Sequence, residues 1–123
     1  MASQYHTGGS WISPIDRLAC YLRDEFECAY CARDLHHEKR ANVTLDHLLS
    51  RDEYHKLDAH TQEQFGDVNA THNLVTACKP CNSRRGNTPW QQFADDNARA
   101  RIIARTYAQP NRDLAAAIIK GEN

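Results

Sequence analysis

The chain has 123 residues, of which 25% are charged and 41% hydrophobic, and its formal net charge at pH 7 is -1. This composition is typical of one globular domain, and a charge near zero argues against a protein that coats a polyanion through charge alone. The longest uninterrupted apolar run, residues 114 to 119, is far shorter than the roughly 20 residues that span a bilayer, and the first residues lack the apolar core of a secretory signal. We therefore expect a cytoplasmic protein without a membrane-spanning segment.

The near-neutral total conceals a separation of charge along the chain. Between Lys79 and Arg105, six basic residues face two acidic ones, whereas between Asp46 and Asp67 six acidic residues face two basic ones. A basic segment suits phosphate groups and an acidic segment suits a cation. The charge pattern therefore allows one part of the chain to meet phosphate while another holds a cation.

Residues 1–13 are polar and predict a flexible N-terminal arm. A helix should begin at Pro14, because Ser13 is a good N-cap and proline is favoured at the first helical position. The apolar residues that follow at helical spacing are Ile15, Leu18, Leu22 and Phe26. The next stretch, residues 26–35, is short and bracketed by cysteines, which favours a tight knuckle in a hairpin.

Two strands are predicted in the middle of the chain, over residues 42–49 and 73–78, because both segments are rich in β-branched and aliphatic residues. The polar segment 50–71 between them favours a long loop that contains a short helix over residues 59–65. Directly after the second strand, a helical turn is expected over residues 80–86.

Two helices are predicted at the C-terminal end. Thr88 as N-cap, with Gln91 as its capping-box partner, predicts one long helix over residues 88–107. A last short helix should start near Asp113 and end at Gly121, because glycine is favoured just after a helix.

Four of the five cysteines form two C-x-x-C pairs, Cys28 with Cys31 and Cys78 with Cys81. Four thiolates complete the tetrahedral shell of zinc, with Zn–S bonds of about 2.3 Å, and leave no open position for water. A redox dithiol is disfavoured because no βαβ pattern surrounds either pair. We interpret the pairs as one structural zinc site. Cys20 lies in the first predicted helix and is expected to be a small buried hydrophobe.

A second set of polar residues lies between and beside the two cysteine pairs. Asp46 directly precedes His47, Asn73 begins the second predicted strand, and Asn82 directly follows Cys81. An isolated Asp-His pair would be interpreted as two solvated surface residues, but this pair is bracketed by the cysteines. The segments CAYC, LDH, HNLVTAC and CNSRRGN occur in an order that resembles the HNH nucleases of the His-Me finger group.

The resemblance implies an α+β fold, with a small ββα-metal core of the His-Me finger type that is similar to a treble clef. Zinc-bound knuckles and flanking α-helices would complete it. The nuclease domain would span residues 14–107 with its core in residues 26–87, and residues 108–123 would form a C-terminal helical extension.

The resemblance also implies roles for individual residues. His47 would be the general base, Asp46 a ligand of the catalytic metal, and Asn73 the residue that steadies the loop carrying the base. Asn82 stands where the family name has its last histidine. Because carboxylate and amide oxygens are hard ligands, Asp46 and Asn82 suit Mg²⁺ or Mn²⁺ better than zinc.

Together these features predict a metal-dependent endonuclease that hydrolyses DNA phosphodiester bonds. Arg84 and Arg85 are expected to bind phosphate, with a solvated surface charge as the alternative for either one. Arg101 and Arg105 are expected to track the nucleic-acid backbone. The expected partner is DNA, double-stranded in preference to RNA.

The biological setting is left open by the sequence. A homodimer or a larger phage, mobile-element or defence complex is compatible with these features, and a double-strand cut by single active sites requires two protomers or two visits. The alternative function is a non-catalytic zinc-binding module of the treble-clef type that recognises nucleic acid or protein without cleaving it.

Overall fold

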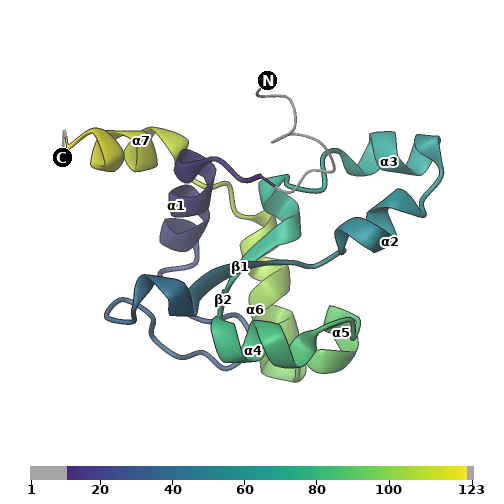
Figure 1. Ribbon diagram of the computed structural model, residues 1–123, viewed down its shortest axis with the longest axis horizontal. Helices are drawn as coiled ribbons and strands as arrows, with labels where there is room; N and C mark the ends of the chain where they lie inside the picture. The colour runs from purple at the N-terminus through teal and green to yellow at the C-terminus, as the bar shows by residue number, and fades with distance from the viewer. Residues whose placement is uncertain (1–10, 122–123) are drawn as a thin grey trace.

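The computed structural model describes residues 11–121, which form a small α+β structure around two paired strands (Figure 1). The strands are β1 (Val43–His47) and β2 (Leu74–Cys78), and they run antiparallel. The helices are α1 (Pro14–Arg23), α2 (Arg51–His55), α3 (Ala59–Phe65), α4 (Lys79–Arg85), α5 (Trp90–Phe93), α6 (Asp96–Tyr107) and α7 (Arg112–Lys120), with 3₁₀ turns η3 (Arg40–Asn42) and η4 (Thr71–Asn73). The predicted α+β class is confirmed.

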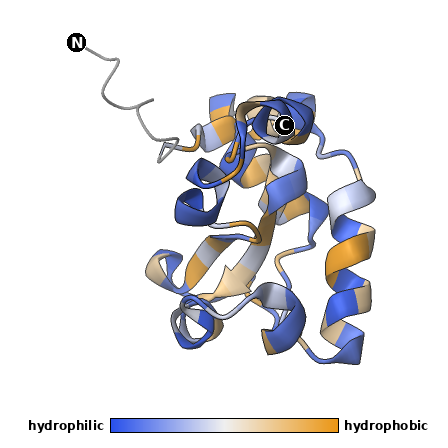
Figure 2. Ribbon diagram, turned by 90° about the vertical axis from the view of Figure 1, so that its right-hand side faces the viewer, coloured by the Kyte–Doolittle hydropathy of each residue, from blue (hydrophilic) through white to orange (hydrophobic). Residues whose placement is uncertain are grey.

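The sheet has apolar side chains on both faces because helices cover both of them. Leu74 of β2 packs with Cys20 of α1, whereas its neighbour Val75 belongs to the cluster that contains Ile102 of α6. Successive side chains of a strand point to opposite faces, so α1 and α6 lie on opposite sides of β2. Figure 2 shows hydrophobic segments in the strands at the centre, with helices of mixed hydropathy around them. A two-stranded sheet is only marginally stable by itself in water, so packing against these helices stabilises it.

The register of the sheet fixes the placement of the predicted Asp-His pair. Asp46 pairs with Val75, and His47 pairs with Leu74. Asp46 therefore shares the α6 face with Val75, and His47 shares the α1 face with Leu74.

The predicted first helix and the hairpin after it are both present. Ser13 caps α1 by accepting the Asp16 N–H at 3.0 Å. The helix ends at Arg23, and Phe26 has a left-handed φ of 53°. Phe26 therefore lies outside α1, although the spacing of apolar residues predicted it to be part of the helix. Glu27 and Asp34 then form an antiparallel bridge, which closes the cysteine-containing hairpin.

Cys20 lies in α1 and is fully buried, as predicted. Burial raises the pKa of its thiol to about 11, so Cys20 is un-ionised near pH 7 and packs as a small apolar side chain.

The single long helix predicted over residues 88–107 is wrong, because α5 and α6 are separate. Ala94 between them is extended, with a ψ of 138°, and its side chain is buried in the core. Asp95 then caps α6 by accepting the Ala98 N–H at 2.8 Å. Burial of Ala94 and the Asp95 cap both stabilise the break between α5 and α6.

The loop predicted over residues 50–71 contains the expected helix α3 and also α2. Ser50 accepts the Glu53 N–H, and the Glu53 carboxylate accepts the Ser50 N–H, each at 3.0 Å. This capping box is visible in the sequence, and it explains why a helix as short as α2 begins where it does.

The C-terminal helix α7 packs against α1 (Figure 1). Arg112 Nε donates to Asp16 Oδ1 at 2.6 Å across this contact, and Gly121 ends α7 in the left-handed conformation. Most of the arm predicted over residues 1–13 falls on residues 1–10, which lie outside the described residues. None of the helices within residues 11–121 has the length and apolar character needed to cross a membrane.

Candidate functional site

The two cysteine pairs come together at one point. Cys28 and Cys31 lie in the hairpin after α1, Cys78 ends β2, and Cys81 lies in the first turn of α4. Their four Sγ atoms all lie within 4.8 Å of one another, and those of Cys31 and Cys78 are 3.9 Å apart. A tetrahedral zinc ion with Zn–S bonds of about 2.3 Å holds its sulfurs about 3.8 Å apart. This four-cysteine cluster is therefore positioned to bind a metal ion such as zinc.

Neighbouring groups set the ionisation of the cluster. Burial opposes ionisation of Cys28, but hydrogen bonds from backbone groups, among them that of Cys31, outweigh it and lower its pKa. Burial raises the pKa of Cys78 and of Cys81. Arg84 Nη2 donates to the Cys81 Sγ at 3.3 Å. A metal cation among the sulfurs would stabilise all four as thiolates.

Asp46 lies near the end of β1 with its carboxylate inside the protein. The carboxylate accepts hydrogen bonds from Tyr30 Oη and from Arg85 Nη1, which is 2.9 Å from each carboxylate oxygen. Burial raises the pKa of Asp46, and the positive charge of Arg85 partly offsets this effect. Because a carboxylate has about four lone-pair sites, these two donors leave capacity for a further ligand.

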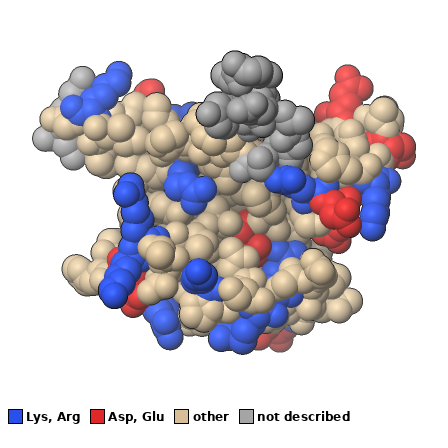
Figure 3. All heavy atoms as spheres, viewed as in Figure 1, with Lys and Arg blue, Asp and Glu red and all other residues tan. Residues whose placement is uncertain are grey.

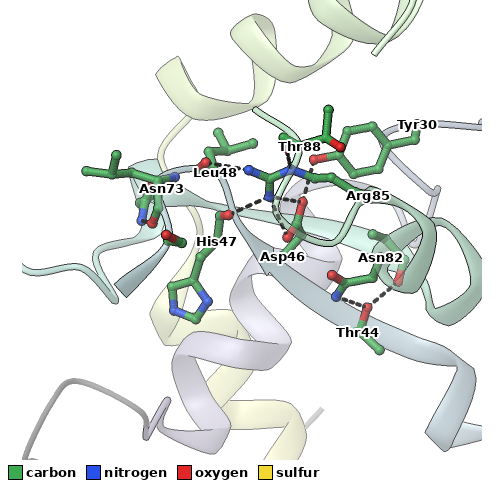
Figure 4. Close-up of polar contacts among 12 residues, drawn as sticks. Tyr30, Thr44, Asp46, His47, Leu48, Asn73, Asn82, Arg85 and Thr88 are labelled. Atoms are coloured by element: carbon green, nitrogen blue, oxygen red, sulfur yellow. Dashed lines mark hydrogen bonds and ion pairs between the residues drawn. The ribbon is translucent and has the colours of Figure 1, made fainter. Parts of the chain in front are cut away.

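Arg85, in the last turn of α4, has its guanidinium bonded inside the protein (Figure 4). Besides Asp46, its Nη1 contacts the His47 carbonyl oxygen at 2.7 Å, Nη2 the Leu48 carbonyl at 2.8 Å and Nε the Thr88 carbonyl at 2.9 Å. Its side chain is only 5% exposed. This placement does not fit the phosphate contact expected from the sequence, because the guanidinium faces internal acceptors and ties the end of β1 to α4.

Asn82 has its side-chain amide fixed by the start of β1. Its Nδ2 donates to Thr44 Oγ1 at 3.0 Å, and Thr44 Oγ1 donates to the Ala77 carbonyl oxygen at 2.8 Å. Because the single hydroxyl hydrogen of Thr44 goes to Ala77, Thr44 can only accept from Asn82. The amide oxygen of Asn82 then points away from Thr44 (Figure 4) and has no hydrogen-bond partner within residues 11–121.

Asp46, His47 and Asn82 line one open pocket of about 410 Å³, which we call the Asp46 pocket. Arg51, the exposed first residue of α2, lines the same pocket and was not selected from the sequence. Figure 3 shows acidic atoms in a hollow near the middle of the face drawn there, with Lys or Arg atoms on several sides of it.

Asn73 lies outside the Asp46 pocket and is buried beneath the segment that follows His47. Its Oδ1 accepts the Leu49 N–H at 2.8 Å, and its Nδ2 donates to the carbonyl oxygens of Leu49 and Val68 at 2.9 Å each. Both the oxygen and the nitrogen of the Asn73 amide are therefore hydrogen-bonded, and these bonds fix the segment between β1 and α2.

His47 points away from Asp46, as adjacent strand residues must (Figure 4). Its Nε2 lies 2.6 Å from Asn69 Oδ1, and Asn69 Nδ2 donates to the Trp11 carbonyl oxygen at 2.8 Å. Asn69 was not selected from the sequence, where it is one of several polar residues in a long loop.

The other three arginines expected to bind nucleic acid differ in how exposed they are to solvent. Arg84 is exposed on α4. Arg101 is partly exposed, with its Nε donating to the Ala29 carbonyl oxygen at 3.0 Å. Arg105 is only 8% exposed and donates to the carbonyl oxygen and to the carboxylate of Glu27, at 2.8 Å each. Arg105 therefore does not fit the expected role in tracking a nucleic-acid backbone, because it joins α6 to the hairpin.

No family model, curated protein or solved structure matches the chain. The chemistry of the site follows from its groups alone. Asp46 and Asn82 give the Asp46 pocket hard oxygen donors, and Arg51 adds a guanidinium, which binds phosphate oxygens. His47 also lines the pocket, and its imidazole, which can take a proton from water near pH 7, points away from Asp46 (Figure 4). These groups are suited to hydrolysis of a phosphate ester.

Proposed function

We propose that the protein is a divalent-metal-dependent endonuclease that hydrolyses DNA phosphodiester bonds. The observation that carries the proposal is that Asp46, His47 and Asn82 line one pocket with the exposed Arg51. The order β1, β2, α4 beside the four-cysteine cluster is the order of a ββα-metal unit, which supports the resemblance to HNH nucleases.

Two kinds of metal site fit the donors. The four-cysteine cluster suits zinc, which four thiolates saturate, so this metal would be structural. The oxygens of Asp46 and Asn82 suit Mg²⁺ or Mn²⁺, because Asn82 Oδ1 lacks a partner within the described residues and the Asp46 carboxylate keeps a lone-pair site. Such an ion, when bound, neutralises charge on the phosphate and on the leaving oxygen.

The protein's own side chains carry the proton transfer. His47 takes a proton from water, the resulting hydroxide attacks phosphorus, and the bond from phosphorus to the 3′ oxygen breaks. The leaving 3′ oxygen takes a proton from water, and His47 then releases its own proton to the solvent. A positioned base of this kind contributes about 10² to 10⁴ in rate. The products carry a 5′-phosphate and a 3′-hydroxyl. Asn73 keeps the base in place through its bonds to Leu49 and Val68.

Double-stranded DNA is the proposed substrate. Arg51 replaces Arg85 as the proposed phosphate-binding group in the pocket, because its side chain is exposed. The exposed bases Arg40, Lys79 and Arg84 lie on η3 and α4, two elements in contact, and would meet the phosphate backbone without reading sequence. The free thiols required by the cluster favour a reducing compartment such as the cytoplasm.

A non-catalytic zinc-binding module that recognises nucleic acid or protein is the second candidate. One observation favours it: Tyr30 and Arg85 already bind the Asp46 carboxylate. A buried ion pair of this kind can serve the fold alone. In that case, DNA or a protein would bind without cleavage, and Mg²⁺ or Mn²⁺ would have no effect.

Incubation with supercoiled plasmid tests the proposal. Zinc-loaded protein is incubated with plasmid, with and without added Mg²⁺ or Mn²⁺, alongside His47→Ala and the matched control His60→Ala, a substitution of an exposed histidine on α3. Metal-dependent nicking by the wild type and by His60→Ala, but not by His47→Ala, is expected. Absence of nicking by the wild type, or equal nicking by His47→Ala, rejects the proposal in favour of the binding module.

A further inference from the structure

Asn69 lies in a tight turn between α3 and η4 that holds it in place. Its backbone N–H donates to Asp67 Oδ1 at 2.8 Å, and the next backbone N–H, that of Ala70, donates to the Asp67 carbonyl oxygen at 2.9 Å. Both ends of its side-chain amide are also bonded, one to His47 and the other to the carbonyl oxygen of Trp11, which is 58 positions earlier in the chain. Asn69 is therefore held at its backbone and at both ends of its side-chain amide.

The direction of these hydrogen bonds determines which ring nitrogen of His47 carries hydrogen. The Trp11 carbonyl oxygen can only accept, so the atom of Asn69 that faces it must be the NH₂ nitrogen. The other amide atom, Asn69 Oδ1, can then only accept from the ring. At 2.6 Å, His47 Nε2 must be the donor, and in a neutral imidazole that leaves Nδ1 without hydrogen.

We propose that Asn69 is a positioning residue that fixes His47 in the Nε2–H tautomer and so makes Nδ1 the nitrogen that accepts the proton from water. Nδ1 has no hydrogen-bond partner within the described part of the chain. The consequence for catalysis rests on the proposed nuclease function, whereas the tautomer itself does not. Because Trp11 orients Asn69, the segment before α1 contributes to the site although it lies far away in sequence.

Loss of the Asn69 amide would leave His47 with two accessible tautomers and a rotating ring. A histidine in the wrong tautomer offers N–H where a lone pair is needed, and groups that orient a catalytic imidazole are correspondingly valuable. Asn69→Asp keeps an acceptor beside Nε2, whereas Asn69→Ala removes it. The two variants therefore separate the loss of the acceptor from the loss of the residue.

Long-range ¹H–¹⁵N spectra of the imidazole rings test the tautomer directly. They are recorded on zinc-loaded, ¹⁵N-labelled full-length protein at a pH about two units above the ordinary imidazole pKa. The His47 signals are identified by their absence in His47→Gln. The wild type should show the Nε2–H pattern, Asn69→Ala the average of both tautomers, and Asn69→Asp the wild-type pattern. The matched control Asn97→Ala, which changes an exposed asparagine of α6, should leave the His47 signals unchanged.

Three spectral outcomes overturn the proposal: an Nδ1–H pattern in the wild type, an Asn69→Ala spectrum identical to the wild type, or an Nδ1–H pattern in Asn69→Asp. Because an Nδ1–H pattern in the wild type or in Asn69→Asp overturns the proposal by itself, poor folding of Asn69→Ala leaves the proposal falsifiable.

Cleavage kinetics test the consequence. Asn69→Ala should lower kcat about 10- to 100-fold with KM unchanged, and Asn69→Asp should recover part of the loss. A wild-type kcat in Asn69→Ala contradicts the positioning role. If the wild type cleaves no DNA, the proposed function fails, but the spectra still decide the tautomer, so the two failures are distinguishable.

Discussion

The four-cysteine cluster and the Asp46 pocket share one helix turn but are built in opposite ways. Cys81 of the cluster and Asn82 of the pocket are adjacent in α4. The cluster is assembled from identical groups at fixed spacing, whereas the pocket is lined by unlike groups from β1, α2 and α4. Asn69, in the loop before η4, bonds to His47 of this lining. The comparison teaches that a thiol of a cluster suited to zinc and an amide that offers a hard oxygen donor can be consecutive residues of one helix.

The two regions also differ in what holds them together. A metal ion would hold the cluster, whereas the pocket is held by the buried ion pair of Asp46 and Arg85, with Tyr30 as a further donor. Since α4 carries both Cys81 and Asn82, closing the cluster also fixes Asn82 relative to Asp46. We therefore expect damage to the cluster to reach the pocket, while several changes in the pocket should leave the cluster intact.

Breaking the cluster should have the largest effect. Cys78→Ser removes one of the four sulfurs, and structural zinc contributes about 10 to 16 kcal/mol to folding in zinc-finger peptides, so the variant should lose zinc and cooperative unfolding. Zinc content and circular dichroism during thermal unfolding measure this. Ser83→Ala, an exposed change on the same helix, is the control. Retention of wild-type stability by Cys78→Ser would mean that the cluster does not hold the fold.

Removing the buried partner of Asp46 should have the next largest effect. Arg85→Ala leaves the Asp46 carboxylate unpaired inside the protein, which should lower the free energy of unfolding by about 3 to 5 kcal/mol. Urea unfolding monitored by fluorescence measures the change. Lys79→Ala, an exposed substitution at the start of α4, should change it by less than about 0.5 kcal/mol. Equal unfolding curves for the two variants would show that Arg85 is not a structural residue.

Asn73→Ala should have a moderate effect. It leaves backbone groups of Leu49 and Val68 without their partner, so the free energy of unfolding should fall by about 1 to 3 kcal/mol. Urea titration, with the exposed Asn87→Ala as control, gives the value. Zinc content should stay at the wild-type level. Loss of zinc would contradict the expectation that this change leaves the four-cysteine cluster intact.

Arg51→Ala should have the smallest effect on stability and a clear one on binding. The residue is exposed, so the free energy of unfolding should change by less than about 0.5 kcal/mol. The slope of the logarithm of the DNA-binding constant against the logarithm of salt concentration, measured with a labelled duplex, should fall by about one, which corresponds to one phosphate contact. Lys56→Ala at the other end of α2 is the matched control, since Lys56 does not line the pocket. Equal salt slopes for the two variants would remove Arg51 from the proposed interface.

The parts of the molecule that short-range patterns determine could be predicted from the sequence. The cysteine spacing specifies the cluster, and β-branched residues locate both strands to within two residues at each end. The break after α5 was missed because burial of Ala94 is a property of the folded core and not of its neighbours in sequence.

Whether a charged side chain is exposed to solvent or bonded inside the protein could not be predicted from the sequence. Arg84 and Arg85 are adjacent, yet one is exposed and the other buried, because successive helical residues are turned by about 100° and only one can face Asp46. Asn69 and Arg51 were missed for the same reason, since their roles depend on His47 and on the pocket formed by distant segments. Neither residue carries a local sign of these partners in the sequence.

Cleavage by zinc-loaded wild-type protein and His47→Ala, measured on a defined duplex with Mn²⁺ on preparations of known zinc content and unfolding midpoint, tests the central claim most directly. We predict that both proteins hold the same amount of zinc and unfold alike, and that only the wild type cuts, leaving 5′-phosphate ends. Uncut DNA with the wild type, or equal cutting by His47→Ala, would contradict a catalytic Asp46 pocket beside a structural zinc site.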